Sequence, residues 1–262
     1  MGSSVERGQP RRAAIVALLG LVLVFFCGAV LSWREGTRFL SRHYFGLRLD
    51  PTHAGYFVPA NRELEVRTDG AARVVLFGDS RIQHWAMPSF GENLQVVNRG
   101  YGGDTTAEAL LRLDRDVIAL NPDLVIIEVG INDLKTIGVF PARRDQIYDQ
   151  TLANTSAIAG RLNQAGIRVI ILSIFPVGPV SLMKKSIWSD ATLVAIDGVN
   201  RELRLLIKEG VTVFDCNSFF SVDGRMDRQY ADDAFHINAK GYDILTARLS
   251  VLVRKTVNDD AF

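Results

Sequence analysis

The sequence predicts an α/β fold: a doubly wound, parallel, five-stranded sheet with helices on both faces, preceded by one transmembrane helix. Two observations lead to this prediction. Short, wholly apolar runs alternate with longer amphipathic stretches through the C-terminal two-thirds of the chain, and one long uncharged run lies near the N-terminus. The alternating pattern is typical of strands that are buried on both faces and joined by crossover helices.

The N-terminal uncharged run covers residues 13–33. A helix of that length is about 31 Å long, which is enough to cross the hydrocarbon of a bilayer. A buried core helix would normally show a polar face, and none is visible here. A cleaved signal peptide is the main alternative, but its apolar region is shorter, about 7–15 residues. We therefore predict an uncleaved single-pass signal anchor.

The sequence determines the membrane orientation of this anchor less clearly than it predicts the anchor itself. Arginines lie on both sides of it, at positions 7, 11 and 12 and at positions 34, 38, 42 and 48. Their count therefore does not decide which end of the helix is cytoplasmic. The leading tail, residues 1–12, is short, as in a signal anchor, and favours an extracytoplasmic C-terminal domain.

The remaining chain divides into three segments. Residues 34–70 mix charged, aromatic and turn-forming side chains, and we expect a juxtamembrane connector that packs partly on the domain. Residues 71–255 carry the alternating pattern and form one domain, which is long enough for a sizeable core. Residues 256–262 form a C-terminal tail.

Charge and cysteine content exclude several function classes. The 30 basic and 29 acidic residues give a net charge of +1, and no basic stripe indicates a nucleic-acid partner. Cys27 lies in the apolar run and Cys216 in the domain, so neither a disulfide nor a cysteine metal site is predicted. No histidine ligand cluster predicts a metal ion, and no phosphate-binding Gly-x-x-x-x-Gly-Lys loop predicts a nucleotide cofactor.

Five apolar runs are the candidate strands. In chain order they are residues 74–77, 94–97, 124–129, 169–174 and 211–214. Each is short, wholly or mainly apolar and rich in β-branched side chains, as expected of a central parallel strand.

Four helices are predicted between and after these strands. Residues 105–108 (Thr-Thr-Ala-Glu) match a capping box, and apolar residues follow at helical spacing to Leu120. A long helix near residues 143–165 is expected to end at Gly166, and another near 190–209 at Gly210. Residues 238–255 form the last helix.

Three polar, glycine-rich turns follow the first three strands. They are residues 78–80 (Gly-Asp-Ser), 98–104 (Asn-Arg-Gly-Tyr-Gly-Gly-Asp) and 130–133 (Gly-Ile-Asn-Asp). Because ligands of open α/β sheets bind beyond the carboxyl ends of the strands, these turns are expected to meet at one functional site.

These turns carry a family resemblance. Residues 77–80 (Phe-Gly-Asp-Ser), 102–105 (Gly-Gly-Asp-Thr), 130–133 (Gly-Ile-Asn-Asp) and 233–236 (Asp-Ala-Phe-His) resemble the four blocks of the GDSL/SGNH hydrolases. All four occur in the order of that family. The resemblance implies the flavodoxin-like SGNH fold over about residues 71–255 and a serine esterase or acylhydrolase activity.

The resemblance also implies a catalytic triad of Ser80, His236 and Asp233. A serine hydroxyl is a weak nucleophile and needs a base to take its proton, which would be His236. Asp233, three residues earlier, would hold the imidazole in the correct tautomer. Asp232 is the alternative carboxylate, and we favour Asp233 because its spacing from His236 fits the family.

By the same resemblance, an oxyanion hole would use the backbone N–H groups of Ser80 and Gly103 and the side-chain amide of Asn132. Losing one such donor typically costs about 10²–10³ in turnover. Gly100 and Gly102 compete with Gly103 for this role, since any of the three could serve only to permit a turn.

The neighbours of these blocks have further expected roles. Asp79 and Asp133 are read as structural, bonding loop amides. His84 lies one helical turn after Ser80, so it could point towards the site, but we expect it to pack beside Trp85. Arg81 stands where the family name has leucine, and a cation there could bear on substrate choice.

A glycine- and proline-containing loop, residues 176–179, follows the fourth predicted strand. We expect it to wall one side of the pocket. Lys184, Lys185 and Trp188 lie beyond this loop in the sequence. We interpret the two lysines as part of a solvated loop.

The resulting prediction is a membrane-anchored serine esterase that needs no metal or cofactor and acts on an O-acetylated glycan or a lipid ester. Two alternatives stay open. One is an O-acyltransferase that uses the same triad with a sugar hydroxyl as acceptor, and the other is a catalytically silent glycan-binding module. A complete triad argues against the second alternative. The oligomeric state is not predicted.

Overall fold

The computed structural model describes residues 9–50, 53–62, 64, 70–180 and 188–258. The chain falls into two compact units, which divide between His53 and Ala54. Lys184 and Lys185 lie outside the described residues.

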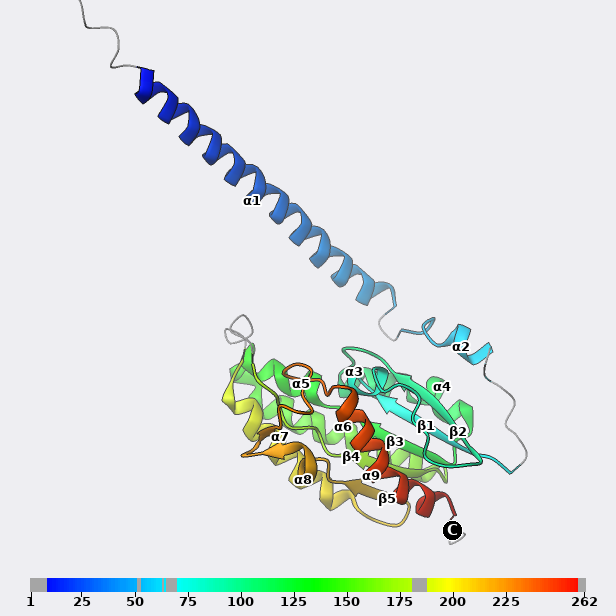
Figure 1. The fold of residues 1–262 in the computed structure, drawn as a ribbon. Helices are drawn as coiled ribbons and strands as arrows, with labels where there is room; N and C mark the ends of the chain where they lie inside the picture. Colours follow the sequence, from blue (N-terminus) through cyan, green and yellow to red (C-terminus); the bar gives the residue numbers. More distant parts are fainter. Residues whose placement is uncertain (1–8, 51–52, 63, 65–69, 181–187, 259–262) are drawn as a thin grey trace, which may run out of the picture. The chain divides into compact units, whose positions relative to one another are not determined.

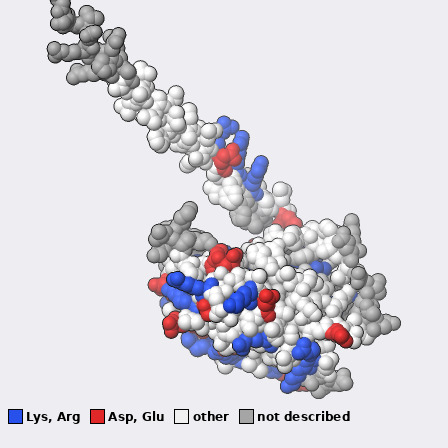
Figure 2. Space-filling view, in the orientation of Figure 1, with Lys and Arg blue, Asp and Glu red and all other residues white. Residues whose placement is uncertain are grey.

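The first unit is one long helix, α1 (Gln9–Leu49). A stretch of it, Ala14–Gly46, is long and apolar enough to cross a membrane, and an 18-residue window within it has a mean hydropathy of 2.9 and no buried residue. Figure 2 shows the apolar part as an uninterrupted uncharged surface, with charged side chains gathered towards the C-terminal end of the helix. The helix continues well past residue 33, into the segment expected to be a connector.

The second unit is built on a five-stranded parallel sheet with the strand order β2-β1-β3-β4-β5. Its strands are β1 (Ala72–Gly78), β2 (Leu94–Gly100), β3 (Leu124–Glu128), β4 (Arg168–Leu172) and β5 (Val211–Phe214). All five predicted strands are confirmed. The register aligns Gly78 at the end of β1 with Gly100 of β2 and Glu128 of β3, so the polar turns begin at the same level.

Helices cover both faces of this sheet, as predicted. The first face carries α4 (Thr106–Asp116), α6 (Arg144–Gln164) and α7 (Asp190–Leu203), and the second carries α9 (Ala239–Asn258). Figure 1 shows α9 crossing one side of the sheet with α6 behind it. Alternate residues of β1 enter the two cores, Val75 and Phe77 the first and Val74 and Leu76 the second. All four are fully buried, which is why the strand is apolar throughout.

Short elements complete the described part of the unit. They are α2 (Val58–Arg62), α3 (Ser80–Gln83), α5 (Ile131–Leu134), α8 (Asn217–Phe220), the 3₁₀ turns Ile118–Leu120, Lys135–Gly138, Pro141–Arg143 and Arg204–Leu206, and a hairpin of β6 (Ser221–Val222) and β7 (Arg225–Met226). None of these was predicted as a separate element.

The predicted helix ends are correct in two cases and wrong in one. The capping box at Thr105 and Glu108 is present in both directions. Gly166 adopts φ +76° just after α6, and its N–H bonds back to Asn163, as in a glycine-terminated helix. Gly210 does not end α7, which stops at Leu203. It turns the chain between the paired residues 208 and 211, with φ +77°.

Part of the expected connector packs on the domain. Phe57 is buried, and the guanidinium of Arg99 lies 4.9 Å from the centre of its ring. Tyr56 makes an edge-to-face contact with Tyr101, and Asn61 accepts a hydrogen bond from Arg99. Through these contacts, residues 56–61 pack against the end of β2 and the turn that follows it.

Candidate active site

Three side chains predicted from distant parts of the sequence meet at the carboxyl edge of the sheet. The Oγ atom of Ser80 lies 2.8 Å from Nε2 of His236. Nδ1 of the same imidazole lies 3.0 Å from Oδ1 of Asp233. The hydroxyl, imidazole and carboxylate therefore form one hydrogen-bonded chain, which is the arrangement that lets a carboxylate orient an imidazole and an imidazole activate a hydroxyl.

The backbone around Ser80 is fixed by a cap and by close packing. Ser80 begins α3, and Asp79 caps that turn by accepting a 2.9 Å hydrogen bond from the N–H of Arg81. A Cβ at Gly78 would lie 1.9 Å from the carbonyl oxygen of Glu128, so only glycine permits β1 to run this close to the end of β3. The expected structural role of Asp79 is thus seen directly.

The loop that carries the other two groups is shaped by Asp233 itself. Its Oδ1 accepts the backbone N–H groups of Phe235, at 2.7 Å, and His236, at 2.9 Å, as well as contacting the imidazole. One carboxylate oxygen therefore holds both the turn and the ring. Asp232 makes no such contact: its side chain is exposed, and only its backbone N–H bonds to His236.

The three expected oxyanion donors lie on the turns after β1, β2 and β3. Gly103 is exposed with φ +92°, and a Cβ there would meet no atom within 4 Å, so backbone conformation rather than crowding calls for glycine. Asn132 is 5% exposed, and its Nδ2 donates one 2.9 Å hydrogen bond to the carbonyl of Asp104. An amide nitrogen carries two hydrogens, so a second N–H is left for a ligand.

The competing glycines have packing roles instead. A Cβ at Gly100 would lie 2.1 Å from the backbone nitrogen of Gln83, and a Cβ at Gly102 would lie 2.6 Å from the side-chain Oε1 of Gln83. The same added Cβ at Gly102 would lie 3.8 Å from the Cβ of Ser80, an ordinary contact. Both glycines therefore bring the turn after β2 against α3.

The chain matches a known family over most of the domain. Residues 66–244 match the GDSL-like lipase/acylhydrolase family, which is more than half of the 262 residues. The chain belongs to this family. The family predicted from the four sequence blocks is confirmed.

Individual relatives agree with this assignment. An arylesterase from Vibrio mimicus is 27% identical over 160 residues, which is 61% of this chain and 64%, less than two thirds, of that protein. A GDSL-like lipase from Bacteroides thetaiotaomicron has a similar structure, with a TM-score of 0.66 at 25% identity over 78% of this chain and 98% of its own. A carbohydrate acetylesterase from Sinorhizobium meliloti shares the fold, with a TM-score of 0.55 at 17% identity over 70% and 99% of the two chains.

Arg81, at the leucine position of the GDSL name, does not face the substrate side. Its side chain is fully buried, its Nη1 pairs with Oε1 of Glu128 at 2.8 Å, and its Nε donates a 2.7 Å hydrogen bond to the carbonyl of Phe235. The expectation that this cation bears on substrate choice is therefore wrong. The guanidinium links the nucleophile turn, the end of β3 and the loop that carries His236.

The loop after β4 packs against the loop that carries His236. Residues 176–178 are buried, and the N–H of Gly178 donates a 2.9 Å hydrogen bond to the carbonyl of Ala234. A Cβ at Gly178 would lie 2.5 Å from the carbonyl oxygen of Asp233. Residues 176–178 therefore support the loop of residues 233–236.

A second buried arginine joins the turns of this GDSL-like site. Arg112 of α4 donates to the carbonyls of Gly78 and Arg99, each at 2.9 Å, and pairs with Asp104 at 2.5 Å. The sequence contains a signal for this role, because Arg112 stands next to Leu113 on the inward face of an amphipathic helix, where a charge is unusual. Sequence reasoning did not use it.

Asn132 has a further partner that the sequence did not reveal. Nζ of Lys135, one helical turn later, donates a 2.5 Å hydrogen bond to its Oδ1. The amide is thus held at both ends, and a cation on its oxygen makes the N–H hydrogens better donors. Asp133 is bonded to the backbone N–H and hydroxyl of Thr106, at 2.9 and 2.7 Å, in the expected structural role.

Burial perturbs the two structural carboxyls next to the site. Desolvation raises the pKa of Asp79 well above its ordinary value, and the neighbouring Glu128 adds to the shift while Arg81 opposes it. Desolvation also raises the pKa of Asp133, and its hydrogen bonds from Thr106 oppose that shift. Oδ2 of Asp79 is buried without a hydrogen-bond partner in the described structure, so no hydrogen bond to that oxygen offsets the desolvation.

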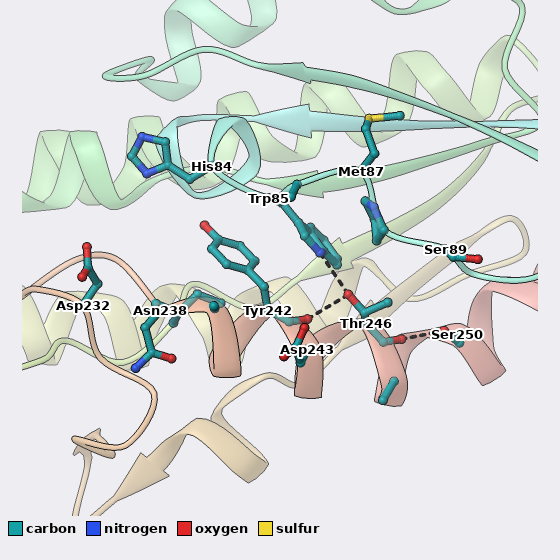
Figure 3. Close-up of a pocket in the computed structure, with 15 residues that line it drawn as sticks. His84, Trp85, Met87, Ser89, Asp232, Asn238, Tyr242, Asp243, Thr246 and Ser250 are labelled. Carbon is teal, nitrogen blue, oxygen red and sulfur yellow. Dashed lines mark hydrogen bonds between the residues drawn. The ribbon is translucent and has the colours of Figure 1, made fainter.

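A groove of about 770 Å³ lies beside the His236 loop, between residues 84–89 and α9. Figure 3 shows His84 at one end and Ser250 at the other. The ring of His84 is exposed and lies 5.2 Å from the ring of His236. His84 was expected to pack beside Trp85 and is found instead against the imidazole of the site. Among the described residues, no group of three or more His, Cys, Asp or Glu side chains could hold a metal ion.

Proposed function

We propose that this GDSL-family protein is a membrane-anchored serine esterase that hydrolyses carboxylic esters through an acyl-enzyme on Ser80. The observation that carries the proposal is the continuous chain from Ser80 Oγ to His236 Nε2 and from His236 Nδ1 to Asp233, at 2.8 and 3.0 Å. Membership of the GDSL-like lipase/acylhydrolase family supports the same reaction class.

The proposed reaction has two half-reactions. Ser80 Oγ attacks the ester carbonyl while His236 takes its proton, and the imidazolium then returns that proton to the departing alcohol oxygen. The acyl group is left on Ser80. Water, deprotonated by the same imidazole, attacks the acyl-enzyme, and the proton passes to Ser80 as the carboxylic acid leaves. Asp233 stays ionised and holds the imidazole in place.

The negative oxygen of each tetrahedral intermediate would be bound by the N–H groups of Ser80 and Gly103 and by Nδ2 of Asn132. In the described structure neither backbone N–H has a hydrogen-bond acceptor, and Asn132 keeps one amide hydrogen unused. Donors that are already fixed stabilise developing charge without the cost of reorganisation. Lys135 and Asp104 provide that fixation for Asn132.

The N-terminal helix supports the membrane part of the proposal. Its candidate span is 33 residues long and contains an 18-residue window with a mean hydropathy of 2.9 and no buried residue. We assign the domain to the extracytoplasmic side, as expected of a signal anchor. Full-length protein should stay in the membrane pellet after alkaline carbonate extraction, and external protease should release the domain from intact spheroplasts. Recovery in the carbonate supernatant would refute the anchor.

Active-site labelling tests the reaction class directly. Full-length protein in detergent is treated with a fluorophosphonate, and mass spectrometry of the peptide that contains Ser80 measures the adduct. Wild-type protein should be labelled and should hydrolyse p-nitrophenyl acetate, and Ser80→Ala should lose both. His236→Ala tests the base: Ser80 remains, but labelling should be slower by orders of magnitude. Folded wild-type protein that is neither labelled nor active would refute the proposal and favour a binding module.

The substrate class is approached by comparing esters. The arylesterase relative makes aryl acetates the first probes. A series of p-nitrophenyl esters of increasing chain length, with acetylated xylan and a lysophospholipid, distinguishes an O-acetylated glycan from a lipid ester. Adding a free glycan to the assay tests the acyltransferase alternative, since transfer that outcompetes hydrolysis would replace the esterase assignment.

A further inference from the structure

The groove beside His236 has a definite relation to the proposed chemistry. Three of its lining residues adjoin the hydrogen-bonded chain: Asp232 precedes Asp233, Ile237 follows His236, and the ring of His84 contacts that of His236. The imidazole is the group that returns a proton to the departing alcohol. His236 itself does not line the groove, but His84 at one end of it lies against the imidazole, so the groove is placed to receive the alcohol half of the ester.

Most polar groups along the groove are committed to bonds within the protein. Thr246 Oγ1 accepts a 3.0 Å hydrogen bond from Nε1 of Trp85 and donates a 2.8 Å bond to the carbonyl of Tyr242 (Figure 3). The hydroxyl of Tyr242 donates to the carbonyl of Arg81, and the amide of Asn238 bonds only to backbone groups. These groups build the groove and are not available to bind a ligand.

Two carboxylates remain available, in addition to the exposed imidazole of His84 at one end of the groove. The side chains of Asp232 and Asp243 line the groove and are exposed, and within the described chain neither has a hydrogen-bond or ion-pair partner. No lysine or arginine is found among the described residues that line the groove. Ionised carboxylates only accept hydrogen bonds, so this surface fits a donor and opposes an anion.

We propose that this groove binds the alcohol half of the ester, and that it selects alcohols that donate hydrogen bonds or carry positive charge over alcohols that carry negative charge. The inference rests on the proposed esterase function. A volume of about 770 Å³ suits a ligand of one or two sugar units or an ammonium alcohol. Both ligands share the required chemistry, whereas a phosphate-bearing alcohol would meet two like charges.

Three acetate esters of matched shape test the charge preference: 3-acetoxyphenyl-trimethylammonium, phenyl acetate and 3-acetoxybenzoate. The measured quantity is the ratio of kcat/KM for the cationic ester to that for the anionic ester, which is compared between variants so that intrinsic reactivity cancels. Asp243→Asn should lower this ratio about two- to fivefold, the size of an exposed charge–charge interaction. Asp232→Asn combined with Asp243→Asn should lower it further. High salt should shrink both effects.

Asp149→Asn is the matched control, because Asp149 is exposed on α6, which covers the opposite face of the sheet. It removes the same charge and should leave the ratio at the wild-type value. An acetylated methyl xyloside separates the two ligand sources. A higher KM for the xyloside in the double variant identifies a sugar alcohol, whereas an effect confined to the cationic ester identifies an ammonium alcohol.

The outcomes separate this inference from the function on which it rests. Wild-type protein that hydrolyses phenyl acetate and labels on Ser80, but whose ratio and xyloside KM do not change in the double variant, overturns the groove proposal alone. Wild-type protein that is inactive and unlabelled overturns the esterase proposal itself.

Discussion

Arg81→Leu restores the residue for which the GDSL family is named, yet it should damage this protein. The guanidinium and Glu128 form a fully buried ion pair at 2.8 Å. Removing one partner of such a pair leaves an uncompensated buried charge and costs about 3–5 kcal/mol. For a domain of this size each kcal/mol lowers Tm by about 2–4 °C. The expected fall is therefore about 6–20 °C, to be measured by thermal unfolding of the full-length protein in detergent.

The double variant Arg81→Leu/Glu128→Leu separates stability from catalysis. Removing both charges should recover most of the lost Tm, since replacing a buried pair by apolar side chains is often neutral. It does not restore the hydrogen bond from Arg81 to the carbonyl of Phe235, which holds the His236 loop. A misplacement of about 1 Å can cost about a hundredfold in rate. We expect labelling of Ser80, per folded molecule, to be about ten- to a hundredfold slower.

Two results would refute this reasoning. A single variant with a wild-type Tm would show that the buried pair is not needed for stability. A stable double variant that is labelled at the wild-type rate would show that the bond to Phe235 does not position the imidazole. Lys255→Leu is the control: this exposed cation lies in the last turn of α9 and has no hydrogen-bond or ion-pair partner in the described structure, so its loss should change neither the Tm nor the labelling rate.

Three further predictions follow from other contacts. Asn132→Ala should lower kcat for p-nitrophenyl acetate by about 10²–10³ with little change in KM, and a loss below threefold would remove Asn132 from the oxyanion hole. Gly178→Ala places a Cβ 2.5 Å from the Asp233 carbonyl, so activity should fall about tenfold or more as the loop shifts; full activity would show that the loop tolerates the strain. Asp79→Asn keeps the cap but removes an acid whose folded-state pKa is raised. Because the folded wild type binds this proton more tightly than the unfolded chain, its stability falls as pH rises above about 4, by up to about 1.4 kcal/mol per pH unit until the raised pKa is reached. Urea unfolding between pH 5 and 8 should show that the free energy of unfolding of the variant, relative to that of wild type, increases as pH rises. Free energies of unfolding that change in parallel with pH would contradict the raised pKa of Asp79.

The strands and most helix ends could be predicted because their causes are local. A run such as residues 124–128 is apolar throughout, so both of its faces must be buried. The capping box at Thr105 and the glycine at 166 satisfy backbone groups a few residues away. Gly210 shows the limit of that reasoning. A glycine after an amphipathic stretch looks like a helix end, but the chain had already left the helix to pair residue 208 with 211.

The sequence by itself determined the fold class, because short apolar runs alternate with amphipathic stretches, and it determined the family through four ordered blocks. The three side chains that meet at 2.8 and 3.0 Å were predicted through that family resemblance. Only the tertiary structure decided what the charged neighbours do. The side chain of Arg81 is buried because it pairs with Glu128, which is 47 residues away in the sequence and lies under the turn that carries Ser80. The groove exists because residues 84–89 come to lie against α9. The local sequence is the same whether a charged side chain faces a substrate or pairs with a buried partner. Burial and pairing depend on contacts between segments that are distant in the sequence.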